Sequence, residues 1–161
     1  MRVVLVRHGE AVDARLARSD ERRWLTDGGR RKVTAVGNTL VELGLSFSCV
    51  YTSPLVRAVQ TAEILAATQP DFDGPVEVHV PLSSDEGTVA QALAPLDHAG
   101  DHAVVVLVSH MPKVEVLGGQ LCQMDRFVSF RTGAACLIDV DEGRGQFQWM
   151  LDPDTLKRER P

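Results

Sequence analysis

The sequence predicts an α/β protein in which helices cover both faces of a mostly parallel sheet, with an antiparallel strand at one edge. Two apolar runs support this prediction, because residues 3–6 and residues 104–108 contain only Val and Leu. A strand without alternating polar residues is covered on both faces, as in parallel sheets. Strand patterns also alternate with helical patterns along the chain, which indicates parallel strands joined by crossover helices. We therefore expect a three-layer α/β/α sandwich.

The first helix after the opening strand is expected over residues 26–43. Apolar residues recur there at helical spacing, a threonine can cap the start, and Gly44 can end the helix. Residues 49–51 predict a short strand. A second helix should follow at once, with Ser53 as its cap and Pro54 in its first position.

The rest of the chain continues the alternation of strands and helices. A strand is expected around residues 76–80 and a third helix over residues 83–96. Pro112 can open a fourth helix after the second apolar run. The tail predicts three further strands, of which the last two are joined by a hairpin-type turn. These strands are expected at residues 127–130, 134–140 and 146–151.

Composition limits the class of protein. With 161 residues, 44% hydrophobic and 24% charged, the chain predicts one globular domain spanning residues 1–161. A net charge of -5 argues against a nucleic-acid-binding protein, which usually carries a basic excess. Three cysteines without close pairing favour free thiols in a reducing cytoplasm. The first apolar run is too short for a signal peptide or a membrane span, so we expect a cytoplasmic protein.

Charged residues follow three of the predicted strands at their carboxyl ends. Arg7 and His8 follow the first strand, Arg57 lies in the first turn of the second helix, and His110 follows the second apolar run. In a parallel sheet these ends lie along one edge, where open α/β sheets bind ligands. Guanidinium groups, imidazoles and helix amides together suit a dianionic tetrahedral group. The sequence therefore predicts a phosphate-binding site.

Two histidines in one phosphate pocket predict two different roles. His8 is the expected nucleophile, because Gly9 would let the main chain approach closely and hold the ring. His110, kept cationic by the anion, would bind the equatorial oxygens alongside both arginines. Met111, at the start of the following helix, is expected to take part in binding the phosphate.

The chain resembles the histidine phosphatase superfamily, the phosphoglycerate mutase-like proteins, in three segments that occur in the same order. They are LVRHGEA at residues 5–11, YTSPLVRAVQTAEIL at residues 51–65 and LVSHMP at residues 107–112. The resemblance implies a covalent phosphohistidine intermediate on His8. It also implies a pocket formed by Arg7, Arg57 and His110, with no metal required.

Within that superfamily, the chain looks most like the small SixA-type phosphohistidine phosphatases. The features that it shares with them are its short length, the helix start LTDGGRRK at residues 25–32 and the closing GQFQWMLDP at residues 145–153. This resemblance implies that the chain removes phosphate from phosphohistidine on a partner protein, such as a histidine phosphotransfer domain. The product would be inorganic phosphate.

The proton donor of phosphoglycerate mutase-like relatives has no recognisable copy in this sequence. Those relatives carry an Asn where this chain has Ala14, and a donor Glu in the loop after the third strand. Asp85 and Glu86 occupy that region, where either could donate a proton or complement a helix dipole. An imidazole leaves more easily than an alkoxide, so a phosphohistidine substrate would tolerate a missing acid.

Two other functions stay open, a general phosphomonoesterase of the same superfamily and a non-catalytic relative that senses phosphate. No metal or other cofactor is expected, because nucleotide-binding motifs are absent and His98 and His102 lack a third ligand. Three arginines, at positions 18, 22 and 23, could rim the pocket, but acids between them favour a solvated loop.

Overall fold

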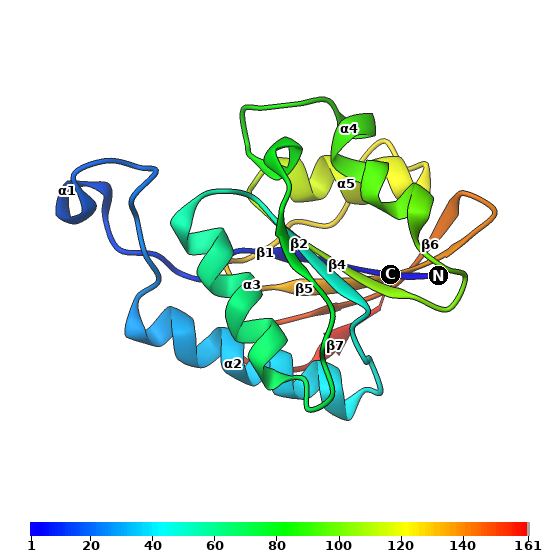
Figure 1. The fold of residues 1–161 in the computed structure, drawn as a ribbon, viewed down its shortest axis with the longest axis horizontal. Helices are drawn as coiled ribbons and strands as arrows, with labels where there is room; N and C mark the ends of the chain where they lie inside the picture. Colours follow the sequence, from blue (N-terminus) through cyan, green and yellow to red (C-terminus); the bar gives the residue numbers. More distant parts are fainter. Residues whose placement is uncertain (161) are drawn as a thin grey trace.

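A seven-stranded sheet forms the centre of residues 1–160, which are the residues that this computed structural model describes (Figure 1). The strands are β1 (Arg2–Arg7), β2 (Cys49–Thr52), β3 (Val76–Val78), β4 (Val104–Ser109), β5 (Ala135–Asp141), β6 (Arg144–Leu151) and β7 (Arg158–Glu159). The α-helices are α1 (Ala14–Ala17), α2 (Asp27–Glu42), α3 (Val56–Thr68), α4 (Val89–Leu93) and α5 (Lys113–Cys122). Two 3₁₀ turns, η1 (Val80–Leu82) and η2 (Ala94–His98), flank α4.

The sheet is mixed, with the strand order β3-β2-β4-β1-β5-β6-β7. The first four of these strands are parallel, as predicted. The remaining three are antiparallel, so the antiparallel part is wider than the single edge strand that we expected. Of the two additional antiparallel strands, the outermost, β7, has only two residues. A strand that short shows no periodicity in the sequence.

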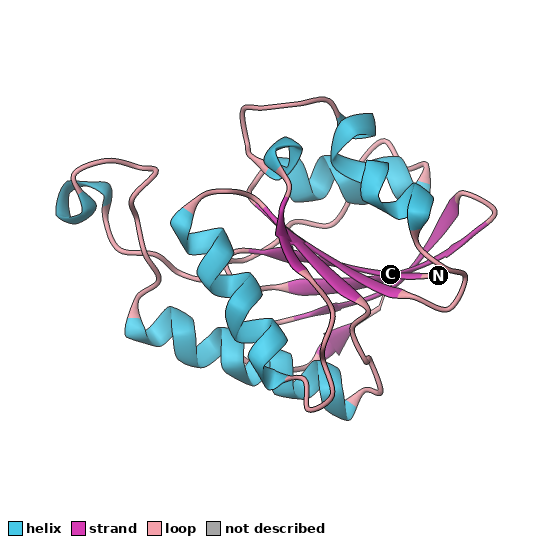
Figure 2. Cartoon of the chain, in the orientation of Figure 1, coloured by secondary structure: helices cyan, strands magenta, loops and turns pink. Residues whose placement is uncertain are grey.

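Helices cover both faces of the sheet (Figure 2), which confirms the predicted three layers. Val4 and Val6 of β1 belong to an apolar cluster with residues of α2 and α3, whereas Val3 and Leu5 belong to a cluster with residues of α4 and α5. Each fully buried Val or Leu stabilises the fold by roughly 1.5–3 kcal/mol. The end of β1, which carries Arg7, is therefore held firmly by the core.

Two predicted helix starts were wrong. The second helix begins at Val56 with Leu55 as its cap, because the hydroxyl of Ser53 contacts a histidine in the site described below. The third helix begins only at Val89, where Thr88 forms a capping box. The chain before it turns through Gly87, whose φ of 69° belongs to the left-handed region and suits glycine.

The strand predicted at residues 127–130 was also wrong. This segment is a loop, in which Phe127 packs against Phe130 and Phe147. Its apolar side chains therefore bury themselves without pairing into the sheet. The three cysteines are free thiols, as expected. Within residues 1–160, no helix has the length and apolar character that crossing a membrane requires.

Candidate active site

Three neighbouring strands deliver the predicted site residues to one edge of the sheet. β2, β4 and β1 lie side by side, and the Cα of Arg7 pairs in register with that of Ser109. His8 directly follows Arg7, and His110 directly follows Ser109. The centroids of their two rings are 4.9 Å apart. Arg57, in the first turn of α3, reaches the same place. The structure thus brings together all four residues that the strand ends predicted.

The ring of His8 is buried and held in one orientation. Its Nδ1 lies 2.7 Å from the carbonyl oxygen of Gly9, which can only accept a hydrogen bond. Nδ1 therefore carries the proton of the neutral ring, and Nε2 keeps its lone pair. The Nε–H of Arg57 donates to that Nε2 over 3.3 Å. His8 thus presents an unprotonated nitrogen to the guanidinium group of Arg57.

Gly9 lets the main chain approach the two helices beneath it. A Cβ at this position would lie 2.7 Å from Cγ2 of Val33 and 3.2 Å from Cδ2 of Leu25, too close for any larger residue without movement. The N–H of Gly9 donates to Oγ1 of Thr61 over 3.0 Å, and that hydroxyl donates to the carbonyl of Arg57 over 2.7 Å. Thr61 thereby ties the backbone beside His8 to the helix that carries Arg57.

Arg57 also contacts Asp20, a residue that sequence reasoning did not single out. Its Nη1 donates to the Asp20 carbonyl over 2.7 Å and its Nη2 donates to Asp20 Oδ2 over 2.9 Å. The other carboxylate oxygen accepts from Nη1 of Arg23 over 3.0 Å. Arg23, predicted to lie in a solvated loop, is thus linked to the site through Asp20.

Two buried nitrogens in this cluster have no hydrogen-bond partner among residues 1–160. They are Nε of Arg7 and Nδ1 of His110. Another nitrogen of each side chain is paired: Arg7 Nη1 donates to the Phe130 carbonyl over 2.7 Å. His110 Nε2 lies 2.7 Å from Oγ of Ser53. Buried polar atoms are nearly always paired in proteins, so these two mark a place for a polar ligand.

Burial keeps both histidine rings neutral. It lowers the pKa of His8 to about 4 and that of His110 to about 3. Burial is the largest cause of both shifts; the positive charges of Arg57 and Arg7 also contribute to lowering both pKa values, whereas the Gly9 carbonyl opposes the shift of His8 and Asp20 opposes that of His110. The expected cationic form of His110 therefore requires the negative charge of a bound anion to compensate it.

These two pKa values predict that the protein loses stability in weak acid. A histidine in the unfolded chain has a pKa near 6.5. Between that pH and about 4, the unfolded chain binds protons that folded His8 excludes, so the free energy of unfolding falls as the pH falls. For His8 the full difference corresponds to roughly 3 kcal/mol.

Urea unfolding at pH 7 and pH 4.5 measures this loss. A His8→Gln variant should lose less stability between the two pH values than the parent protein, because its side chain does not titrate. His98→Gln, at an exposed position, serves as the matched control and should behave like the parent. Equal losses in the parent and in His8→Gln contradict the prediction.

The remaining predicted site residues are Met111, Asp85 and Glu86. Met111 is half-buried in the short connection before α5. Asp85 and Glu86 are exposed in the loop before α4 and do not lie in the first turn of a helix. The expectation that they could complement a helix dipole was therefore wrong. Lys113 holds this loop, since its buried Nζ donates to the carbonyls of Pro81 and Glu86 over 3.1 and 2.8 Å.

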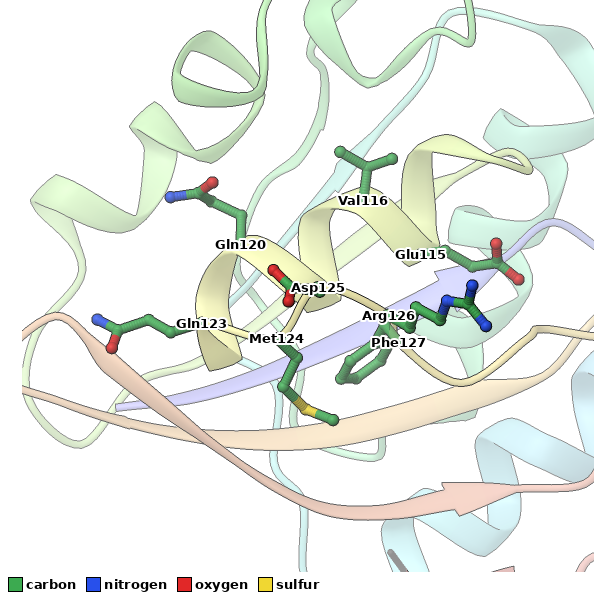
Figure 3. A pocket seen from close by; sticks show the side chains of 9 residues that line it. Glu115, Val116, Gln120, Gln123, Met124, Asp125, Arg126 and Phe127 are labelled. Carbon is green, nitrogen blue, oxygen red and sulfur yellow. The ribbon is translucent and has the colours of Figure 1, made fainter.

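Residues 1–160 contain no group of three or more His, Cys, Asp or Glu side chains that could hold a metal ion. A pocket of about 780 Å³ runs along α5 and the loop after it, lined by residues between Glu115 and Phe127 (Figure 3). None of its nine lining residues is one of the four predicted pocket residues. The four predicted pocket residues therefore lie outside this pocket.

Comparisons with known proteins agree with this geometry. The family model of the histidine phosphatase superfamily (branch 1) matches residues 3–82. Phosphohistidine phosphatase SixA of Escherichia coli (strain K12) is 34% identical over 160 residues, which are 98% of this chain and 97% of that protein.

Solved structures give the same result. The structure of the protein histidine phosphatase SixA complexed with tungstate superposes with a TM-score of 0.87 at 32% identity, and the match covers 98% of this chain and 100% of that one. A phosphoserine phosphatase from Entamoeba histolytica, with a TM-score of 0.71, 17% identity and coverage of 97% and 99%, shares the fold alone. This chain belongs to the histidine phosphatase superfamily.

Proposed function

We propose that this protein is a phosphohistidine phosphatase, a hydrolase that removes phosphate from a histidine of a partner protein. The observation that carries the proposal is a pair of buried nitrogens, Nε of Arg7 and Nδ1 of His110, that have no hydrogen-bond partner among residues 1–160 in the cluster that holds His8. A tetrahedral oxyanion would supply acceptors to such donors and place phosphorus next to Nε2 of His8. The likeness to SixA, including a structure that binds the oxyanion tungstate, supports this substrate class.

The first chemical step transfers the phosphoryl group to His8. The hydrogen bond from the Nε–H of Arg57 to Nε2 of His8 is released, and Nε2 attacks phosphorus with that lone pair while the bond from phosphorus to the substrate nitrogen breaks. The substrate ring, protonated on its other nitrogen by solvent, leaves as neutral imidazole. The new positive charge on His8 is met by the Gly9 carbonyl, which still accepts from Nδ1. Arg7 and Arg57 bind the equatorial oxygens.

The second step returns the free enzyme. Water attacks phosphorus, the bond to Nε2 breaks, and the electron pair returns to His8 while phosphate and one proton depart. Both Asp85 and Glu86 are exposed in their loop, so we assign neither of them as a required proton donor. Without a positioned acid, the poor leaving group of a sugar phosphate should react slowly.

A substrate panel tests this proposal. We expect kcat/KM for a phosphohistidine peptide to exceed that for glucose 6-phosphate by at least about 100-fold, the lower range for the contribution of a general acid. A phosphoserine peptide of the same sequence controls for peptide binding. Comparable turnover of all three substrates would favour the alternative, a general phosphomonoesterase.

The partner that we propose is a phosphorylated protein, such as a histidine phosphotransfer domain. We also propose that residues 1–161 act as one domain, because β1 at the start of the chain and β5 to β7 at its end share one sheet. The three free thiols agree with a reducing compartment such as the cytoplasm.

A further inference from the structure

Asp20 contacts the guanidinium group of Arg57 from the loop between α1 and α2. The Arg57 side chain is 6% exposed, whereas the Asp20 side chain is 56% exposed and lies at the outer side of the cluster. Both the carbonyl and the carboxylate of Asp20 accept hydrogen bonds from Arg57, and the carboxylate also bridges to Arg23. One residue therefore holds two of the positive groups of the site.

The contacts on Arg57 divide its donors between two neighbours. A guanidinium group carries five N–H bonds in a rigid planar fork. Asp20 takes one from Nη1 and one from Nη2, and the Nε–H points to Nε2 of His8. Two N–H bonds, one on each terminal nitrogen, are not used in these contacts. Asp20 therefore does not saturate Arg57.

We infer that Asp20 is a positioning residue for phosphoryl transfer, which orients Arg57 toward the reactive nitrogen of His8. The inference rests on the proposed function in one respect, namely that Arg57 binds the transferring phosphoryl group. Ordering an arginine side chain costs conformational entropy. If Asp20 already holds Arg57 in place in the free enzyme, this entropy is not lost during the reaction, and the activation barrier is lower.

Charge supports the same role. Arg23 and Arg57 lower the pKa of the Asp20 carboxyl, mainly through the hydrogen bond from Arg23, so it is ionised at neutral pH. An ionised carboxylate between two guanidinium groups offsets their mutual repulsion at short range. It also binds each more strongly than a neutral acceptor would.

A carboxylate that blocks the phosphoryl site would predict the opposite change in oxyanion affinity. If the carboxylate of Asp20 occupied the place of the phosphoryl group, substrate would have to displace it. Its removal would then tighten the binding of oxyanions. A positioning residue has the reverse effect, because its loss leaves Arg57 free to turn away. The sign of the change in oxyanion affinity therefore separates the two roles.

The test compares Asp20→Asn with Glu21→Gln, which removes the same charge one residue away at an exposed position. We measure the Kd for vanadate, kcat and KM on the phosphohistidine peptide, and the ring ¹⁵N signals of His8. For Asp20→Asn we expect kcat to fall about 10- to 100-fold and vanadate binding to weaken about 10-fold. The His8 signals should shift, because the Arg57 donor moves away from Nε2.

The controls keep the result interpretable. Glu21→Gln should stay within about twofold of the parent in every measurement, and Asp20→Glu should recover part of the lost kcat. The inference is overturned if Asp20→Asn matches Glu21→Gln, or if it binds vanadate more tightly at undiminished kcat. The vanadate and ¹⁵N measurements need no turnover, so they report on Asp20 even if the phosphohistidine peptide proves not to be a substrate.

Discussion

Replacing His8 by Ala is expected to lower phosphatase turnover by about 1,000-fold or more, the scale of losing a covalent nucleophile. The substitution removes the only ring in the site whose Nδ1 is fixed by a carbonyl acceptor, which leaves Nε2 unprotonated. The other ring, His110, has its Nε2 against Ser53. It is therefore oriented as a binding group and cannot replace the nucleophile without turning.

Trapping of a radioactive phosphoryl group measures this effect most directly. A ³²P-labelled phosphohistidine protein is mixed with the enzyme, and the products are separated under alkaline denaturing conditions, because phosphohistidine is labile in acid. The parent and the exposed-site control His98→Ala should both become labelled, and His8→Ala should not. Label on His8→Ala, or none on the parent during turnover, contradicts the assignment. A parent that binds vanadate but neither labels nor turns over would instead indicate a phosphate-sensing protein.

Arg57→Lys is expected to lower kcat/KM about 100- to 1,000-fold, although the charge is kept. Arg57 makes three directed contacts at once, to the ring of His8 and to both acceptors of Asp20. A lysine ammonium is a single point of charge and cannot span these positions while also donating twice to a phosphoryl group. Steady-state kinetics on the phosphohistidine peptide measures the loss.

A matched control for this substitution is available on the surface. The Arg131 side chain is exposed and pairs with Asp152 and Asp154, so Arg131→Lys makes the same exchange in an ion pair that includes none of the four pocket residues. It should change kcat/KM by less than about twofold, as expected of an exposed pair. If Arg57→Lys is as active as Arg131→Lys, then the planar fork of Arg57 is not used in the reaction.

Much of this site could be predicted because its signals are local in the sequence. The buried strands are recognisable as apolar runs in the sequence. The reactive residues come directly at the end of such runs, as Arg7 and His8 do at the end of β1. Parallel pairing then places these strand ends on one edge. The positions of His8, His110 and the two arginines thus need no knowledge of the loops.

The residues that sequence reasoning missed are those whose partners are set by loops. Ser53 has the composition signal of a helix cap, yet its hydroxyl meets His110 across 57 positions of sequence. Asp20 is one acid among many charges, and only the path of its loop brings it to Arg57. Such contacts depend on backbone turns that no periodic pattern encodes. The available hint was a basic cluster interrupted by two adjacent acids, Asp20 and Glu21, and the sequence does not tell which of them reaches Arg57.

The distance between the two imidazoles has a consequence for how this molecule can diversify. Their centroids lie 4.9 Å apart, which is about the spacing of neighbouring strands. The reason is that the two histidines directly follow β1 and β4, which pair with each other in the sheet. The distance between the rings is thus set by the pairing of β1 with β4 and does not depend on the segment around α1 or on residues 83–87. Residues 83–87 and the part of the α1 segment that does not contact Arg57 can therefore change length or charge to suit a new partner while the spacing of the two rings is kept.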